Sequence, residues 1–163
     1  MFNSNQKISS VTLHNSGVIR YQPHIQKEIE IAIHDLVEKN YFKPQPSFFG
    51  EGHIGPYDIR VFVHEGRVII DISGQDKAKL GELALSVRPL KKVIKEYFVV
   101  CENYYEATKK ASPEKIEAID FGRRALHNDG SDRLKTLLFD KVGLDDNTAR
   151  RLFTLICALH IRA

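Results

Sequence analysis

The chain has 163 residues, of which 42% are hydrophobic and 28% are charged. This balance is typical of a folded globular protein and excludes a chain that is disordered throughout its length. Its 24 lysines and arginines exceed its 21 aspartates and glutamates, giving a formal net charge of +3. Such a small excess does not by itself indicate a nucleic-acid partner, which would require the basic side chains to gather on one face.

Two other classes of protein are not expected from this sequence. The 2 cysteines, Cys101 and Cys157, lie among apolar residues and are too few for the disulfide framework of a secreted protein. The N-terminal residues carry no basic-then-apolar signal, and no apolar run approaches the length of about 18 residues that a membrane span needs. We therefore expect a cytoplasmic protein with no membrane segment.

The first half of the chain predicts strands around one helix. Residues 7–13 are expected to form a short strand, followed by a turn at 15–17. Apolar residues at helical spacing predict a helix over 24–39, with Pro23 in its first turn. Residues 43–56, rich in proline and glycine, are expected to form a flexible loop. Alternating apolar side chains over 57–64, 67–72 and 82–87 then predict an antiparallel meander.

The second half predicts helices throughout. One apolar face over 89–110 indicates a first helix, and Ser112 followed by Pro113 suits the start of a second. This second helix is expected to end near residues 128–130, where Gly130 resembles a helix stop. A shorter helix should begin at residue 131 or 132, and a last one over 146–162 should follow the cap Asp145. The result is a bundle of about four helices.

Strands grouped before helices predict an α+β fold rather than alternating strands and helices. A chain of this length can bury roughly two-thirds of its unfolded surface in one core. We therefore expect one domain over residues 1–163, sheet-rich over 1–87 and helical over 88–163. No internal repeat or linker divides it.

Charged and polar side chains are densest in residues 116–131. Asp120, Arg123, Arg124 and His127 lie there at helical spacings beside apolar positions, so some of them should border a buried seam. Asp120 and Arg124 are spaced for a helical ion pair. Arg123 falls on the apolar side and needs an acceptor there, because a charge near a buried seam requires a partner.

This cluster supports three interpretations, which the sequence leaves open. Arg150 and Arg151, at the start of the last predicted helix, can converge on it. In the first interpretation the arginines tie helix ends together through carbonyls and carboxylates. In the second, they form an anion pocket. In the third, His127 acts as a general acid or base positioned by Asp120.

Other motifs carry weaker signals. Residues 50–55 match the glycine pattern of dinucleotide-binding loops, but neither a strand before them nor a helix after them is predicted, so no cofactor is expected. Cys157 and His160 are spaced like two metal ligands, but no second pair accompanies them, so no metal is expected either. We expect His160 to be a hydrogen-bonded core residue.

Four segments carry a resemblance to a known family. They are residues 33–44 (IHDLVEKNYFKP), 97–107 (YFVVCENYYEA), 116–131 (IEAIDFGRRALHNDGS) and 148–160 (TARRLFTLICALH). Together they resemble an uncharacterised protein family of alphaproteobacteria, one of the short UPF-type families with no assigned activity. The resemblance implies a bacterial cytoplasmic protein and supplies neither a reaction nor catalytic residues.

The sequence thus favours a non-catalytic protein that binds an unidentified partner protein or a small anionic ligand, and that forms a homodimer. The helical half would supply the ligand-binding residues Arg123, Arg124, His127, Arg150 and Arg151. The alternative is an enzyme acting on a phosphorylated or carboxylated small molecule, with His127 and Asp120 as its catalytic pair. A nucleic-acid module ranks third, because it needs one basic face that joins residues 88–95 to 109–110, and glutamates interrupt it.

Overall fold

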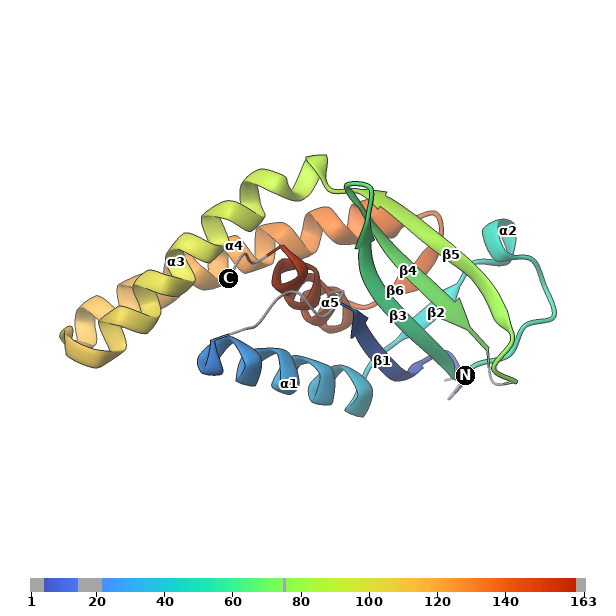
Figure 1. Ribbon diagram of the computed structural model, residues 1–163, viewed down its shortest axis with the longest axis horizontal. Coiled ribbons are helices and arrows are strands. Elements are labelled where there is room, and N and C mark those ends of the chain that lie inside the picture. Colours follow the sequence, from blue (N-terminus) through green and yellow to red (C-terminus); the bar gives the residue numbers. More distant parts are fainter. Residues whose placement is uncertain (1–4, 15–21, 75, 161–163) are drawn as a thin grey trace.

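The computed structural model describes residues 5–14, 22–74 and 76–160. A sheet lies at one end of the molecule, and helices form the other end (Figure 1). The predicted α+β fold is therefore confirmed, with strands concentrated in the first half of the chain and long helices in the second. The predicted turn at residues 15–17 lies outside the described part of the chain.

The main sheet contains β1 (Ile8–His14), β3 (Tyr57–His64), β4 (Arg67–Ser73) and β5 (Lys79–Ser86), in the order β1-β3-β4-β5. The predicted antiparallel meander of β3, β4 and β5 is confirmed. β1 adds a fourth strand to it, parallel to β3. Alternate side chains of these strands, including Val61, Ile70 and Leu83, are buried in the same core as the helices.

The first helix, α1 (Pro23–Glu38), is confirmed, and Asn40 joins its end to the sheet. The Asn40 side-chain amide donates to the carbonyls of Leu36, at 2.7 Å, and Ile8, at 2.9 Å. Its oxygen accepts from the amide of Ile8 at 2.7 Å. Because all three groups are backbone groups at element ends, this one side chain satisfies polar atoms that the fold would otherwise leave unpaired.

The segment predicted as a loop, residues 43–56, contains more regular structure than expected. It includes the end of β2 (Phe42–Pro44) and the short helix α2 (Pro46–Phe49). β2 pairs antiparallel with β6 (Val142–Leu144), so it is ordered by residues about 100 positions away rather than by its own sequence pattern. This pairing places the end of α1 next to the start of the last helix.

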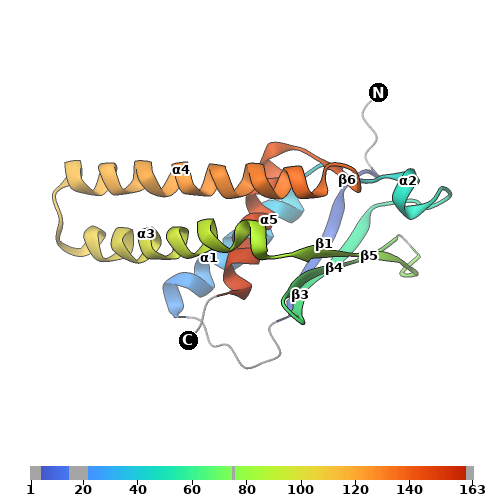
Figure 2. The ribbon, with the colours of Figure 1, turned by 90° about the horizontal axis from the view of Figure 1, so that it is seen from above.

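The helical half consists of η1 (Arg88–Leu90), α3 (Lys91–Lys110), α4 (Pro113–Leu138) and α5 (Asp146–Leu159). α3 and α4 run antiparallel as a long hairpin that extends away from the sheet (Figure 2). α5 packs against both α4 and α1 and lies between them (Figure 1). The predicted caps are confirmed: Ser112 accepts from the amide of Lys115 and Asp145 from the amide of Thr148. Residues 161–162 of the predicted last helix lie outside the described residues.

The predicted end of a helix at residues 128–130 is wrong, because α4 continues through them to Leu138. A Cβ atom on Gly130 would lie 2.1 Å from Cζ of Phe153. The absence of a side chain at Gly130 therefore leaves the room that this ring occupies. The Ser131 hydroxyl donates to the carbonyl of His127, one turn earlier, at 2.7 Å. Residues that resemble a helix stop therefore serve the contact between α4 and α5.

Candidate functional site

The five predicted ligand-binding residues all line one pocket of about 350 Å³. We call it the arginine pocket; its side chains come mainly from α1, α4 and α5, with Tyr97 from α3. The complete lining is Glu28, Ile31, Ala32, Asp35, Tyr97, Arg123, Arg124, His127, Arg150, Arg151 and Thr154. The sequence therefore predicted which residues meet, although it did not place α1 opposite them.

Asp120 organises the α4 side of the arginine pocket. Its Oδ1 accepts from Arg123, at 2.6 Å from Nη2 and 3.0 Å from Nε, and its Oδ2 lies 3.2 Å from Nε of Arg124. Burial, the largest single effect, lowers the pKa of Arg123, but the hydrogen bond to Asp120 and the electrostatic contributions of Tyr97, Asp120 and Cys101 together outweigh it and raise that pKa. The Arg123 guanidinium also lies 4.7 Å from the ring centre of Tyr104. The predicted pair of Asp120 with Arg124 is confirmed, and Asp120 is also the acceptor that Arg123 needed.

His127 is held as a neutral ring at the inner wall of the pocket. Its Nε2 lies 2.8 Å from the Thr154 hydroxyl and its Nδ1 3.4 Å from the Ser131 hydroxyl. The ring packs edge-on against Tyr97 and Phe153. Burial, reinforced by the positive charges of Arg150 and Arg123, lowers the pKa of His127 to about 4. The imidazole is therefore uncharged at neutral pH.

The structure does not bring Asp120 and His127 together as a catalytic pair. The two are seven residues apart, so roughly 10 Å of helix rise separates them although they share a face. The contacts given above engage the Asp120 carboxylate with arginines and the His127 nitrogens with hydroxyls. This geometry does not position His127 through Asp120 for acid–base catalysis.

α5 supplies the other two arginines, and their contacts differ. Arg150 donates to the side-chain oxygen of Asn128 on α4. Arg151 reaches the carbonyl of Asn147 at 3.3 Å, and its Nη2 lies 3.9 Å from Oδ2 of Asp35 on α1. Its Nε atom is buried and has no hydrogen-bond partner among the described residues. A buried donor of this kind is costly unless an acceptor completes it.

Sequence reasoning missed the residues that α1 and α3 contribute. Thr154 lies three and four positions after Arg151 and Arg150, so helical spacing alone could have placed it on the same face. Glu28, Asp35 and Tyr97 gave no such signal, because only the packing of α1 and α3 onto the other helices brings them to the pocket.

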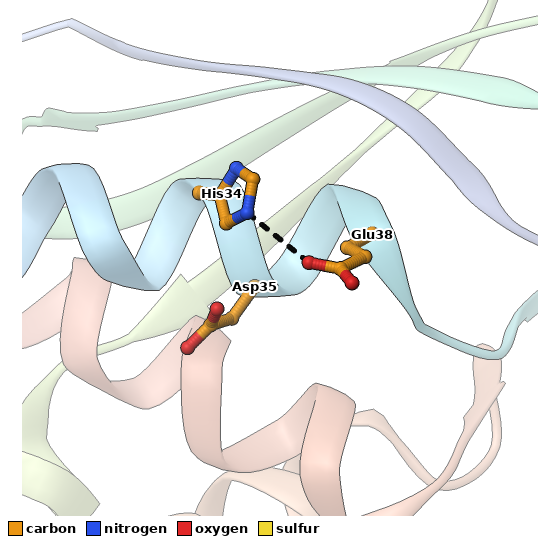
Figure 3. A group of neighbouring side chains, drawn as sticks. All are labelled: His34, Asp35 and Glu38. Atoms are coloured by element: carbon orange, nitrogen blue, oxygen red, sulfur yellow. Dashed lines mark ion pairs between the residues drawn. The ribbon is translucent and has the colours of Figure 1, made fainter.

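A group of potential metal ligands lies on α1 and shares Asp35 with the arginine pocket. Among the residues that the structure describes, His34, Asp35 and Glu38 have ligand atoms within 4.8 Å of one another. His34 pairs with Glu38 at 3.1 Å, whereas the carboxylate of Asp35 points toward α5 (Figure 3). Asp35 faces Arg151 there, and the His34 and Glu38 side chains are exposed. We assign no metal site to this group.

The remaining sequence motifs stay apart from the arginine pocket. Residues 50–55 lie between α2 and β3, so no helix follows them. Arg88, Lys91, Lys92 and Lys95 are exposed, and Lys92 lies 3.9 Å from Glu96. The predicted hydrogen bond of His160 is confirmed, to the carbonyl of Ile156 at 2.7 Å, but the residue is half-buried and not part of the core. Within the described ranges, no helix is both long and apolar enough to cross a membrane.

Comparison with known proteins identifies the family. Residues 5–162 match the uncharacterised protein family UPF0262. A UPF0262 protein of Paramagnetospirillum magneticum is 41% identical over 157 residues, which cover 96% of this chain and 97% of the relative. One of Caulobacter vibrioides is 44% identical over 159 residues, covering 98% and 96% of the two chains. No solved structure matches the chain. The resemblance in the sequence is thus confirmed, and the chain belongs to the uncharacterised family UPF0262.

Proposed function

We propose that this protein binds a small anionic ligand in the arginine pocket. The observation that carries the proposal is the convergence of four arginines from two helices on a pocket of about 350 Å³. Three carboxylates line or border the pocket, those of Glu28, Asp35 and Asp120, and a fourth near Arg150, that of Asp146, is paired with Lys135 at 2.7 Å, which leaves positive charge in excess. A carboxylate or phosphate matches guanidinium groups in shape as well as in charge.

Arg151 is the residue whose guanidinium a ligand would engage. Its Nε is buried without a partner, and its ion pair with Asp35 is long, at 3.9 Å. Nε itself has no surface that an anion can reach, but the Arg151 side chain is 32% exposed, so an anion oxygen can bind beside its Nη atoms and supply there the close negative charge that Asp35 does not. Arg123, by contrast, already uses two of its donors on Asp120. We therefore assign Arg151 to the ligand and Arg123 mainly to holding the pocket in shape.

Calorimetric titration with inorganic phosphate and with acetate, at an ionic strength kept constant with sodium chloride, tests the proposal. We expect saturable binding of at least one anion and a loss of about tenfold or more in affinity for Arg151→Gln. The matched control is Arg133→Gln, because Arg133 is an exposed arginine of α4 that pairs with Asp129 at 3.2 Å. Absence of binding by both anions, or equal loss in the two variants, would overturn the proposal.

We also infer that the protein works in the cytoplasm. Both cysteines are free thiols, and Cys157 is fully buried. Free thiols are typical of proteins in reducing compartments. Fractionation of cells that carry an epitope-tagged copy tests the inference, and recovery of the protein with the periplasmic contents would contradict it.

A homodimer is a further part of the proposal. Val99 on α3 and Phe121 on α4 are large apolar side chains that the hairpin leaves 57% and 70% exposed. Exposed apolar groups favour association, but two side chains supply only a fraction of the roughly 1,200–2,000 Å² that a stable interface buries. We therefore propose a weak, concentration-dependent dimer.

A further inference from the structure

A second, larger pocket adjoins the arginine pocket. It has a volume of about 510 Å³ and is lined by residues of α1, α3, α4 and α5. Glu28, Tyr97, Arg123 and Thr154 line both pockets. Because these four residues belong to both linings, the two pockets adjoin at Glu28, Tyr97, Arg123 and Thr154.

The second pocket, which we call the apolar pocket, has a different chemistry. Its inner wall includes Ile25, Ile29, Phe98, Cys101 and Cys157. Burial raises the pKa of Cys101 to about 11 and also raises that of Cys157. Both thiols therefore stay protonated at neutral pH and behave as small apolar groups.

Charged or titratable side chains, among them His24, Glu102 and Arg123, also line the apolar pocket. His24 stacks on Tyr105 with the ring centres 3.8 Å apart, and its Nε2 lies 3.5 Å from Glu102. Arg123 stands where the two pockets meet, with its guanidinium against the Tyr104 ring. Glu28 also stands there but is exposed, so water reduces its repulsion of an anion. Arg123 therefore lies where the apolar pocket adjoins the arginine pocket, whereas the carboxylate of Glu102 lies beside His24.

We propose that the ligand is an amphipathic monocarboxylate, an unbranched medium-chain fatty acid in its free form. Its carboxylate would lie among Arg150 and Arg151, and its hydrocarbon chain would pass Tyr97 into the apolar pocket. This inference rests on the proposed function and adds the apolar half of the ligand to it. Charge complementarity sets the direction of the chain, because a carboxylate in the apolar pocket would lose its hydration without gaining four arginines. The volume of the apolar pocket, about 510 Å³, lies within the range of sites that bind small molecules.

A chain-length series on the unmodified protein tests the inference. Acetate, hexanoate, octanoate and decanoate are titrated calorimetrically, with 1-decanol and decylamine as ligands that share the tail but lack the anion. Each buried methylene should increase affinity up to about fourfold, so decanoate should bind at least about 100-fold more tightly than acetate. Decanol and decylamine should bind at least about tenfold more weakly than decanoate.

Substitutions separate the two pockets. Cys101→Phe places a ring in the apolar pocket and should weaken decanoate binding while leaving acetate unchanged. Ala84→Phe is the control, because Ala84 is exposed on β5 and lines neither pocket. Arg151→Gln should weaken both ligands. The chain-length series decides the matter if Cys101→Phe loses cooperative unfolding.

The outcomes distinguish this inference from the proposed function. If acetate and decanoate bind equally, the apolar half is overturned and the anion site stands. If decanol binds as tightly as decanoate and Arg151→Gln changes neither, the anion site itself is overturned. If none of these compounds binds while phosphate does, the ligand is not a fatty acid.

Discussion

Arg123 and Arg124 are neighbours that share one carboxylate but differ in their surroundings. The Arg123 side chain is 26% exposed, makes two hydrogen bonds to Asp120 and stacks on Tyr104, whereas that of Arg124 is 57% exposed. We expect Arg123→Ala to lower the free energy of unfolding by about 2 kcal/mol, because charged hydrogen bonds and a cation–π contact are lost. Arg124→Ala should cost less than about 0.5 kcal/mol.

Urea unfolding of both variants measures the difference. Circular dichroism at the start of each titration shows whether the helices are intact. Equal, small changes for the two substitutions would mean that Asp120 and Arg123 contribute no more than an exposed helical pair.

His127 predicts a dependence of stability on pH. Its pKa is lowered from the ordinary 6.5 to about 4, first by burial and then by Arg150 and Arg123. The unfolded chain therefore binds the proton more readily than the folded chain between these two values. The contribution of neutral His127 is complete above about pH 6.5, falls as the pH drops toward 4, and amounts to about 3 kcal/mol in total.

The comparison of wild type with His127→Gln isolates this residue from the carboxylates that also titrate. Urea unfolding between pH 5 and pH 7.5 should show a steeper loss of stability in the wild type than in the variant. Parallel curves would contradict a neutral, buried His127. A steeper loss of stability in the variant would show that folding raises the pKa of His127 instead of lowering it.

At the level of single residues, the sequence predicted the cluster well and its internal pairing less well. Positions 120, 123, 124 and 127 follow from the helical repeat, which is local. The partners of His127 do not, because Thr154 lies 27 positions away and reaches the ring only when α5 packs on α4. Local spacing can therefore place residues on a face but cannot choose between acceptors from another helix.

Two glycines of the same helix, Gly130 and Gly122 of α4, differ in what surrounds them and can therefore be compared by the same substitution. Gly130 faces Phe153, and an added Cβ would lie 2.1 Å from the ring, whereas a Cβ on Gly122 would meet nothing within 4 Å apart from its neighbours and the helix's own backbone. Gly122→Ala should raise the free energy of unfolding by up to about 1 kcal/mol, since alanine favours helices. Gly130→Ala should lower it by about 1 to 3 kcal/mol despite the same gain, because the ring must move.

Denaturant midpoints of the two variants check this contrast. Stabilisation by both substitutions would show that Gly130 does not need its open space for Phe153. Destabilisation by both would show that a side chain at position 122 makes an unfavourable contact, contrary to the open space around Gly122 in this structure.

Elements whose signals are local were predicted, and elements that depend on distant partners were not. α1 and the meander carry clear helical and alternating patterns. β2 and β6 are three residues each, too short for any period, and form because they pair with one another. The predicted break in α4 failed for a related reason: the contact of Gly130 with Phe153 outweighs the weak helix propensity of glycine.

For the whole molecule, the parallel pairing of β1 with β3 is what joins the sheet to the helices. A parallel pair requires a crossover, and α1 lies within the connection between the two strands. α1 then packs on α5, so it closes the side of the arginine pocket opposite α4. The site therefore depends on the complete fold. The sequence, by contrast, had suggested that the helical half alone would form it.

The hairpin of α3 and α4 extends from this body (Figure 2) and leaves Val99 and Phe121 exposed, so we expect it to mediate a weak dimer. Light scattering coupled to gel filtration should show an apparent mass that rises with protein concentration, because the exposed apolar area is too small for a permanent dimer. Phe121→Glu should hold the protein at the monomer mass, since a dimer would then bury a charge without a partner. Phe139→Glu is the control, because Phe139 is 80% exposed and directly follows the last residue of α4, well away from Phe121 along the helix. A monomer at every concentration, or equal effects of the two substitutions, would show that the hairpin is not the interface.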